Sequence, residues 1–511
     1  MAAKIQLRSQ RGPAMNPGLD ALIAEFRRTG TLSGLPREHF IHGAYQPGSG
    51  SAALETFDPG SGQAFAQFAA GGAAEVDQAV DAARRALRGA WGDAAPAERG
   101  QTLAAIAQQV REHADRLALV ESLDSGKRLC EAQADVRGVV RAFEYYAGAA
   151  DKMQGDSFPL DKAYVGFSIE EPVGVAAQII PWNYPLGTAA RGIAPALAAG
   201  CTVVAKPAEQ TPLSALMLAE LASAAGLPDG VLNVVTGEGA TAGAALVSHP
   251  GIQHITFTGS VATGQQVMRA AASHVTRVLL ELGGKSPLVV LADADVEQAL
   301  HGVLGAIYEN AGQICSAGSR LIVERSLHGQ FIERLLDRVG QLGLGHGLTN
   351  PDVGPVNSLA HLNRIHAHVA SAAARGNPVL AGGSVAHPAC APGGWFYRPT
   401  VIEASCAQDA VVQQEIFGPV LVVQQADDLE QAIALANGTD YALAAGIYTR
   451  DIGRAYRFAR QVDAGQVYIN EYFAGGIEVP FGGNRRSGFG REKGLEGIRS
   501  YCKLKSIVAR V

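Results

Sequence analysis

Apolar residues recur along the chain with two different spacings, and each spacing predicts its own kind of structure. In residues 73–91 and 96–123 they recur every three or four positions with polar residues between them, which predicts amphipathic helices. From Val173 onwards, short apolar runs rich in β-branched residues alternate with helical segments. This alternation is typical of a parallel sheet covered by helices on both faces. The strands predicted in this part are 174–180, 202–206, 231–235 and 254–257, with a helix at 212–225.

A second α/β unit is predicted to begin at Pro287. Its first strand is 287–291, and Asp293 or Asp295 caps the following helix, which runs towards Asn310. The later elements predicted here are strands at 321–323, 420–423, 444–448 and 466–470 and helices at 429–436 and 451–461. A chain of 511 residues exceeds what one hydrophobic core accommodates, so two large units that meet near residues 283–284 are expected.

Two further segments alternate polar and apolar residues and lie outside these units. Residues 163–171 predict a projecting hairpin, and residues 503–508 predict a strand near the C-terminus. Exposed strand edges need a partner to satisfy their backbone groups. The protein is therefore expected to form a homo-oligomer, either a homodimer or a homotetramer.

Composition narrows the range of possible functions. The charged share of 18% is ordinary for a soluble globular protein, and the net charge of −6 argues against nucleic acid as a partner. The longest apolar stretch, 193–205, contains Pro195 and falls short of the ~20 residues that span a bilayer. It is interpreted as buried core, and no membrane association is expected.

The cysteines and the N-terminus both favour a cytoplasmic protein. Six cysteines are scattered without the spacing of a disulfide framework or a metal site, so reduced thiols and no bound metal are expected. The first residues are basic but lack the apolar core of a secretory signal. Residues 1–18 are interpreted as a mobile tail rather than a targeting signal, with Met15 as an alternative start.

Cys315 is the first candidate for chemistry. It lies in a loop rich in small residues, just after the helix predicted to run towards Asn310. Only a few per cent of an ordinary thiol is thiolate at neutral pH, because its pKa is ~8.5. A catalytic cysteine therefore needs help from backbone amides or a base. A lone cysteine is more often a small buried residue, and this interpretation is kept for Cys130, Cys201, Cys390, Cys406 and Cys502.

Glu281 and Asn183 would supply what the thiol lacks. Glu281 ends a predicted buried strand, where it is either a general base with a raised pKa or an exposed strand-end residue. Asn183, in the Pro-Trp-Asn-Tyr-Pro run at 181–185, is a candidate oxyanion donor. A nucleophile, a base and an oxyanion donor together predict an enzyme that forms a thioester on Cys315.

Two strand ends carry residues suited to a dinucleotide. Residues 257–264 follow a strand and open a helix, and their glycines would let backbone amides approach a pyrophosphate. They lack the Gly-x-Gly-x-x-Gly fingerprint, so an ordinary turn is the alternative. Lys206 and Glu209 follow another strand, where they form either a solvated ion pair or a grip on an adenosine ribose. The carboxylate would repel a 2′-phosphate, which favours NAD over NADP.

Taken in order, these motifs resemble those of the NAD(P)-dependent aldehyde dehydrogenase superfamily over roughly residues 35–500, nearly the whole chain. The matching segments are 181–185, 257–260, 281–285, 312–315, 415–419, 480–483 and 487–492. The resemblance implies an α/β fold with a Rossmann-type cofactor domain, an α/β catalytic domain and a small oligomerisation β-sheet. The implied division is 1–18 as the tail, 19–150 and 173–283 as the NAD-binding domain, 284–485 as the catalytic domain, and 151–172 and 486–511 as oligomerisation segments.

The resemblance also implies a reaction. Cys315 attacks an aldehyde, Asn183 and the Cys315 backbone N–H hold the oxyanion, hydride passes to the nicotinamide, and Glu281 activates the water that releases a carboxylic acid. The implied cofactor contacts are Ile180, Pro181, Trp182, Lys206, Ala208, Glu209, Gly239, Gly243, Phe257, Thr258, Gly259, Ser260, Thr263, Leu282, Glu415 and Phe417.

Departures from the family pattern bear on the substrate. Arg191 and Gly192 stand where many relatives carry Trp-Lys, and Glu309 stands where apolar residues are frequent. Small side chains at Gly187 and Thr188 would widen a tunnel walled by Tyr184, which favours a bulky or aromatic aldehyde; Arg191 and Glu309 allow a polar or charged one instead. The implied substrate contacts are Tyr184, Thr188, Arg191, Glu309, Ile314 and Ser316.

Two more departures concern the cofactor side and the C-terminal motif. His361 stands where many relatives have a Gln that touches the cofactor ribose, and Arg485 replaces a common Lys.

Three rival functions remain. A CoA-acylating dehydrogenase usually lacks the base at the position of Glu281. A non-catalytic protein with this fold would be expected to lose the site, yet Asn183, Glu281 and Cys315 are all present. A thiol hydrolase or acyltransferase would leave Lys206, Glu209 and the turn at 257–264 without a purpose.

Overall fold

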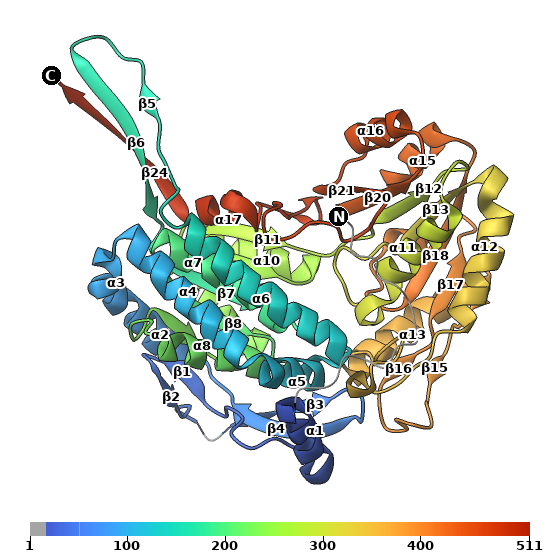
Figure 1. Ribbon diagram of the computed structural model, residues 1–511, viewed down its shortest axis with the longest axis horizontal. Coiled ribbons are helices and arrows are strands. Elements are labelled where there is room, and N and C mark those ends of the chain that lie inside the picture. The colour runs from blue at the N-terminus through green and yellow to red at the C-terminus, as the bar shows by residue number, and fades with distance from the viewer. Residues whose placement is uncertain (1–16, 51) are drawn as a thin grey trace.

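The computed structural model describes residues 17–50 and 52–511, which form two lobes and a projecting arm (Figure 1). The first lobe is built on an eight-stranded sheet of order β2-β1-β9-β8-β7-β10-β11-β23. Its central strands are parallel: β7 (Val175–Ile180), β8 (Thr202–Pro207), β9 (Leu232–Val234), β10 (His254–Thr258) and β11 (Arg277–Glu281). These strands are apolar on both faces, as expected of a parallel sheet that helices cover on each side.

The two faces of this sheet pack into two separate hydrophobic cores. Ala176 and Val203 pack with one set of helices, whereas Val175 and Val204 pack with the other. The first core includes α4 (Pro96–Glu112), α5 (Ala114–Ser125), α6 (Leu129–Ala149), α7 (Pro185–Ala199) and α8 (Leu213–Ala224). The second includes α2 (Ala73–Leu87), α9 (Ala244–Val247) and α10 (Val261–Ala272). The remaining elements of this lobe are α1 (Pro17–Thr29), β1 (His39–Ile41), β2 (Ala44–Gln46), β3 (Ala53–Asp58), β4 (Gln63–Ala69), α3 (Ala90–Asp93), the π-helical turn η1 (Gly239–Gly243) and β23 (Gly488–Phe489).

The second lobe contains a seven-stranded sheet of order β14-β17-β18-β13-β12-β20-β21. Its strands are β12 (Pro287–Val290), β13 (Arg320–Glu324), β14 (Val379–Ala381), β17 (Thr400–Glu403), β18 (Val420–Ala426), β20 (Ala444–Tyr448) and β21 (Gln466–Ile469). Its helices are α11 (Val296–Tyr308), α12 (Arg325–Gly340), α13 (Leu359–Ala374), α14 (Ala410–Gln413), α15 (Leu429–Ala436) and α16 (Ile452–Gln461). Smaller elements are the 3₁₀ turns η2 (Glu309–Gly312) and η3 (Gly347–Thr349), and the strands β15 (Val385–Ala386), β16 (Phe396–Tyr397), β19 (Tyr441–Ala442) and β22 (Asn484–Arg485).

A three-stranded antiparallel sheet forms the arm that extends from the first lobe (Figure 1). Its order is β24 (Cys502–Arg510), β6 (Tyr164–Pro172) and β5 (Ser157–Phe158), and it is reached through the short helix α17 (Gly494–Ser500). Leu504 and Val508 on the outer strand are 59% and 60% exposed. The strand predicted near the C-terminus thus pairs with the segment predicted to form a hairpin, and Leu504 lies opposite Glu170.

The structure confirms most elements expected from periodicity and corrects some. Asp295, not Asp293, caps α11, because its carboxylate accepts a hydrogen bond from the Gln298 N–H. The predicted helix 96–123 is two helices that meet at His113. The stretch 193–205 is buried as expected, and it comprises the end of α7, which contains Pro195, and the start of β8.

Several predictions concern residues or roles that the fold does not decide. Residues 1–16 of the predicted tail lie outside the described residues, whereas residues 17 and 18 belong to α1. The division into cofactor, catalytic and oligomerisation domains stays a prediction; β23, from the predicted oligomerisation segment, pairs with β11 in the first sheet. Among the described helices, none has both the length and the apolar character that crossing a bilayer requires.

Candidate active site

A cavity of about 510 Å³ carries the predicted reactive residues. Cys315 lines it, together with side chains from α6, α7, the loop after β21 and the start of α17. The six predicted substrate residues lie around the same cavity: Tyr184, Thr188, Arg191, Glu309, Ile314 and Ser316. Residues predicted from two distant motifs are thus brought to one site.

The backbone after α11 turns Cys315 towards this cavity. Asn310, Ala311 and Gly312 have φ values of 46°, 53° and 74°, which reverse the chain just before the cysteine. Asparagine and glycine adopt this left-handed conformation more readily than other residues, whereas alanine does not. The conformation of Ala311 therefore has to be imposed by the contacts of its neighbours.

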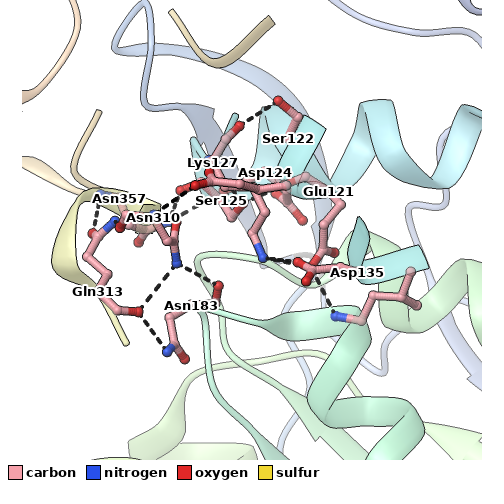
Figure 2. A network of polar contacts seen from close by, with 12 residues as sticks. Glu121, Ser122, Asp124, Ser125, Lys127, Asp135, Asn183, Asn310, Gln313 and Asn357 are labelled. Carbon is pink, nitrogen blue, oxygen red and sulfur yellow. Dashed lines mark hydrogen bonds and ion pairs between the residues drawn. The ribbon is translucent and has the colours of Figure 1, made fainter. Parts of the chain in front are cut away.

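A network of amide hydrogen bonds imposes it (Figure 2). The Asn183 amide Nδ2 donates to the Gln313 carbonyl at 2.9 Å, and Asn310 Nδ2 donates to the Asn183 carbonyl at 3.2 Å. The Gln313 side-chain oxygen accepts from the Asn357 N–H at 2.9 Å. Only one of the two Asn183 amide hydrogens is used in this way, so the other can bind an oxyanion. Asn310 and Asn357 were not identified from the sequence, because amide-to-backbone bonds between distant loops leave no local pattern.

Glu281 is buried at the carboxyl end of β11, and the charges of Arg191 and Lys493, which line the cavity, act on it. It is 1% exposed, and neither carboxylate oxygen has a hydrogen-bond partner among the described residues. Burial, and then the negative charge of Glu492, raise the pKa of Glu281 well above its ordinary value, while Arg191 opposes them. A carboxylate in this state readily takes up a proton, which is what a general base near neutral pH must do.

The Cys315 thiol is also held in its protonated form. Burial raises its pKa to about 12, and only Arg191 and the Ser316 backbone N–H act strongly in the opposite direction. Arg191 forms an ion pair with Glu492. Because Arg191 acts on the pKa of both Cys315 and Glu281, it couples the two groups electrostatically.

Glycines at 283 and 284 allow the two lobes to approach at this point. A Cβ at Gly283 would lie 2.0 Å from the Glu415 carboxylate, and a Cβ at Gly284 would lie 2.4 Å from the Cys315 carbonyl. The Gly284 N–H donates to Glu415 at 2.8 Å. The glycine pair therefore ties the strand that carries Glu281 to the loop that carries Cys315.

Most of the predicted cofactor residues lie at the carboxyl ends of adjacent parallel strands, where open α/β sheets bind their ligands. Residues 180–182 lie at the end of β7, residues 206, 208 and 209 at the end of β8, and Leu282 just after β11. Residues 257–260 and 263 run from the end of β10 into the start of α10. Gly239 and Gly243 bound η1 after β9, and Glu415 and Phe417 precede β18. Fourteen of the sixteen positions thus lie at one edge of the first sheet, and Glu415 and Phe417 lie just before β18 of the second sheet.

The contacts at this edge fit a dinucleotide. Lys206 is buried and its ammonium lies 2.9 Å from Glu209, so the two can share a pair of ribose hydroxyls. The Thr258 hydroxyl is buried without a hydrogen-bond partner among the described residues. Ser260 caps α10 by accepting from the Thr263 N–H at 3.2 Å, which leaves the first N–H groups of that helix open to an anion.

His361 contacts both Phe417 and Trp182, two of the predicted cofactor residues. Its Nε2 bonds to the Phe417 carbonyl at 2.6 Å, and its ring packs edge-on against Trp182. Burial lowers the pKa of His361 to about 4, so the ring is neutral. Arg485 instead forms an ion pair with Asp463.

Two further expectations can be compared with the structure. The six cysteines are free, but Cys130, Cys390 and Cys406 are exposed, so the interpretation as buried residues is wrong for these three. They lie in loops or at a helix start, where no apolar run surrounds them. Within residues 17–50 and 52–511, no group of three or more His, Cys, Asp or Glu side chains is arranged to hold a metal ion.

Comparison with known proteins gives a consistent result. Residues 45–507 match the aldehyde dehydrogenase family. Betaine aldehyde dehydrogenase of Bacillus subtilis is 39% identical over 472 residues, which cover 92% of this chain and 96% of the relative. The NADP/NAD-dependent aldehyde dehydrogenase PuuC of Escherichia coli is 41% identical over 473 residues, 92% of this chain and 94% of the relative.

Solved structures agree with these sequences. A putative aldehyde dehydrogenase from Burkholderia cenocepacia superposes with a TM-score of 0.91 at 45% identity, covering 93% of this chain and 99% of that one. Betaine aldehyde dehydrogenase from Staphylococcus aureus in complex with NAD+ gives a TM-score of 0.92 at 37% identity, covering 93% and 95%.

Proposed function

Since the chain belongs to the aldehyde dehydrogenase family, we propose that it oxidises an aldehyde to the carboxylic acid through a thioester on Cys315, with NAD as the hydride acceptor. The observation that supports this most directly is Glu281, a buried carboxylate without a hydrogen-bond partner among the described residues, whose charge acts on the pKa of Cys315. A CoA-acylating enzyme has no use for a base that activates water, so Glu281 favours hydrolysis.

Cys315, Arg191 and Asn183 act in the first half of the reaction. The Cys315 sulfur adds to the aldehyde carbon as its proton leaves to solvent in the cavity, and the positive charge of Arg191 favours the thiolate. The carbonyl oxygen becomes an oxyanion between the Asn183 amide and the Cys315 N–H. Collapse of this oxyanion expels a hydride from the same carbon and leaves a thioester. NAD, when bound, supplies the two-electron acceptor for that hydride.

Hydrolysis then restores the enzyme. Glu281 removes a proton from water, whose oxygen adds to the thioester carbon, and the carbon–sulfur bond breaks. Cys315 leaves as thiolate and regains a proton, and the carboxylic acid is released. The buried, unpaired state of Glu281 supports this step because its carboxylate accepts a proton easily.

Asn183 gives the first test of these roles. We expect Asn183→Ala to lower kcat/KM about 10²-fold, because one preorganised oxyanion donor is lost at the barrier. Steady-state kinetics would measure this, with Asn233→Ala as the matched control. Asn233 is another buried asparagine, in β9, away from the cavity. An unchanged kcat/KM in the Asn183 variant would contradict the oxyanion role.

The preference for NAD depends on Glu209. Its carboxylate lies beside Lys206 at the strand end where the adenosine ribose would bind, and a 2′-phosphate there would meet a negative charge. We expect Glu209→Gln to improve kcat/KM with NADP roughly tenfold and to change that with NAD little. Comparing both cofactors at one aldehyde concentration tests this; an equal change for both would contradict it.

The substrate, assembly and compartment are also part of this proposal. Small residues at Gly187 and Thr188 leave room for a bulky or aromatic aldehyde. The exposed apolar residues of β24 support a homodimer or homotetramer, and three exposed free cysteines suit a reducing cytoplasm.

The decisive experiment is NADH formation by the purified protein across a panel of aldehydes, with and without CoA. We expect NADH and the free acid at the same rate whether CoA is present or not. An acyl-CoA product would replace the proposal by the CoA-acylating reaction. Binding of NAD without oxidation of any aldehyde would favour a non-catalytic role, and ester hydrolysis without NAD binding would favour a thiol hydrolase.

A further inference from the structure

Lys493 is a cation in the wall of the cavity that Cys315 lines, and no acidic group is paired with it. It immediately precedes α17, and its side chain is partly buried. Within residues 17–50 and 52–511 its ammonium forms no hydrogen bond or ion pair, and it lies over the ring of Phe481, 5.3 Å from the centroid. Lysines that lose water without gaining an anion are uncommon, because the charged form is then destabilised.

The backbone at Lys493 is also unfavourable for a lysine. Its φ of 62° and ψ of 174° lie in a region that is essentially restricted to glycine. Desolvation, and then the positive charge of Arg191, lower the pKa of Lys493 to about 8. Glycine at this position would remove both penalties, so the lysine is better explained by a bound ligand than by stability.

Lys493 and Arg191 are two cations beside Phe481 in the wall of the cavity that Cys315 lines. The acidic groups that act on Lys493 are Glu492, Glu281 and Glu478. Arg191 also lies over the Phe481 ring, with its guanidinium carbon 5.1 Å from the ring centroid. Arg191 is already paired with Glu492. Of these two cations, Lys493 is therefore the one without an ion-pair partner among the described residues, and it can bind a ligand. The charges of Cys315 and Glu281 both act on its pKa.

None of these acidic side chains forms an ion pair with Lys493 among the described residues. Glu492 is paired with Arg191 and Glu478 with Arg141, and burial raises the pKa of Glu281. The other acidic side chains of the cavity are Asp135 and Glu309. Asp135 is paired with Lys127 at 2.5 Å. Glu309 has no ion pair among the described residues, but burial raises its pKa to about 7, so part of it is protonated near neutral pH. The electrostatic interactions of Glu309 are with Arg128, Glu131, Asp135 and Lys127 rather than with Lys493.

We propose that Lys493 binds a carboxylate of the substrate, and that the protein therefore oxidises an aldehyde that also carries a carboxylate, an acidic semialdehyde. This rests on the proposed function of Cys315. The cavity of about 510 Å³ accommodates a short chain between an aldehyde at Cys315 and a carboxylate at Lys493. Lysine acts here as a point charge on a flexible stem, which suits a carboxylate that approaches end-on.

The test compares three aldehydes of similar length that differ in charge: 4-oxobutanoate, butanal and 4-trimethylammoniobutanal. We expect the wild-type protein to have the highest kcat/KM with 4-oxobutanoate. Lys493→Met should lower kcat/KM for 4-oxobutanoate roughly 10- to 100-fold, mainly through KM, as expected for the loss of a charged hydrogen bond. Butanal should change little, and Lys493→Arg should retain the preference for the anion.

Further variants and one binding measurement complete the design. Lys493→Gly removes the charge but relieves the backbone, so it replaces the Met variant if that variant folds poorly. Succinate, a dicarboxylate without an aldehyde, should bind the wild-type protein more tightly than either variant in calorimetry. This measurement tests Lys493 even if no aldehyde is oxidised, a result that would contradict the function proposed for Cys315 instead.

Two outcomes would overturn the role of Lys493. Equal losses with butanal and 4-oxobutanoate would assign it a structural role. A wild-type preference for 4-trimethylammoniobutanal that disappears in Glu309→Gln would show that the cavity selects a cation through Glu309.

Discussion

Replacing Glu281 by glutamine is expected to reduce steady-state turnover about 10³-fold, within the usual range for a lost general base. Glutamine has the shape of glutamate but takes up no proton, so the thioester forms and then persists. The first turnover should still release NADH, as a burst close to one equivalent per active site. Stopped-flow absorbance would record the burst, and mass spectrometry would detect the acyl group on Cys315.

The controls for this experiment come from the same cavity. Cys315→Ala should give neither burst nor steady-state turnover. Folding should tolerate Glu281→Gln well, because the wild-type carboxylate is 1% exposed and has no hydrogen-bond partner among the described residues. If the variant lost the burst and the steady-state turnover equally, Glu281 would act in a step before the thioester forms. A variant with normal turnover would place the base elsewhere.

The pH dependence follows from the raised pKa of Glu281. A general base works only when deprotonated, so hydrolysis in the wild-type protein should become faster as pH rises through the pKa of this residue. Glu492 is the second cause of that raised pKa, after burial. Removing its charge in Glu492→Gln should shift the rising limb to lower pH, whereas the residual turnover of Glu281→Gln should lose this limb.

The residues that the sequence could identify are reactive side chains next to a strand or helix that the sequence pattern also predicts. Glu281 ends a strand whose apolar run is visible in the sequence, and Lys206 ends another. Parallel strands bring such ends to one edge of a sheet, so the strand pattern already groups them. Cys315 follows α11, whose start is recognisable in the sequence from the N-cap residue Asp295.

The residues that the sequence could not identify depend on contacts between distant segments. Lys493 lies in a glycine-rich C-terminal segment, which pairs with β11 through β23 and lines the cavity at Lys493. Asn310 and Asn357 act through backbone groups of other loops. The helices α6 and α13 were not predicted, and α13 carries His361, whose bond to the Phe417 carbonyl links a helix to a loop 56 residues away.

Replacing Lys127 by methionine is expected to destabilise the protein by about 3–5 kcal/mol, the usual result of breaking a buried ion pair from one side. Lys127 is 1% exposed, and its ammonium lies 2.5 Å from Asp135 and 3.5 Å from Glu121 (Figure 2). Glu121 also accepts the Leu186 N–H at the start of α7, three residues after Asn183. Without the cation, two carboxylates would share this site unpaired.

Urea denaturation at several pH values would measure the loss, with Lys152→Met as the control. Lys152 pairs with Asp151 on the surface, where its side chain is 63% exposed, so that variant should change stability by less than about 1 kcal/mol. Desolvation already raises the pKa of Asp135 to about 6 with Lys127 present. Without Lys127 this pKa rises further, so the folded variant binds more protons than the unfolded chain and loses stability as pH increases. The deficit should therefore be larger at pH 8 than at pH 5, and a deficit that is the same at both values would mean that packing, not charge, is what Lys127 contributes.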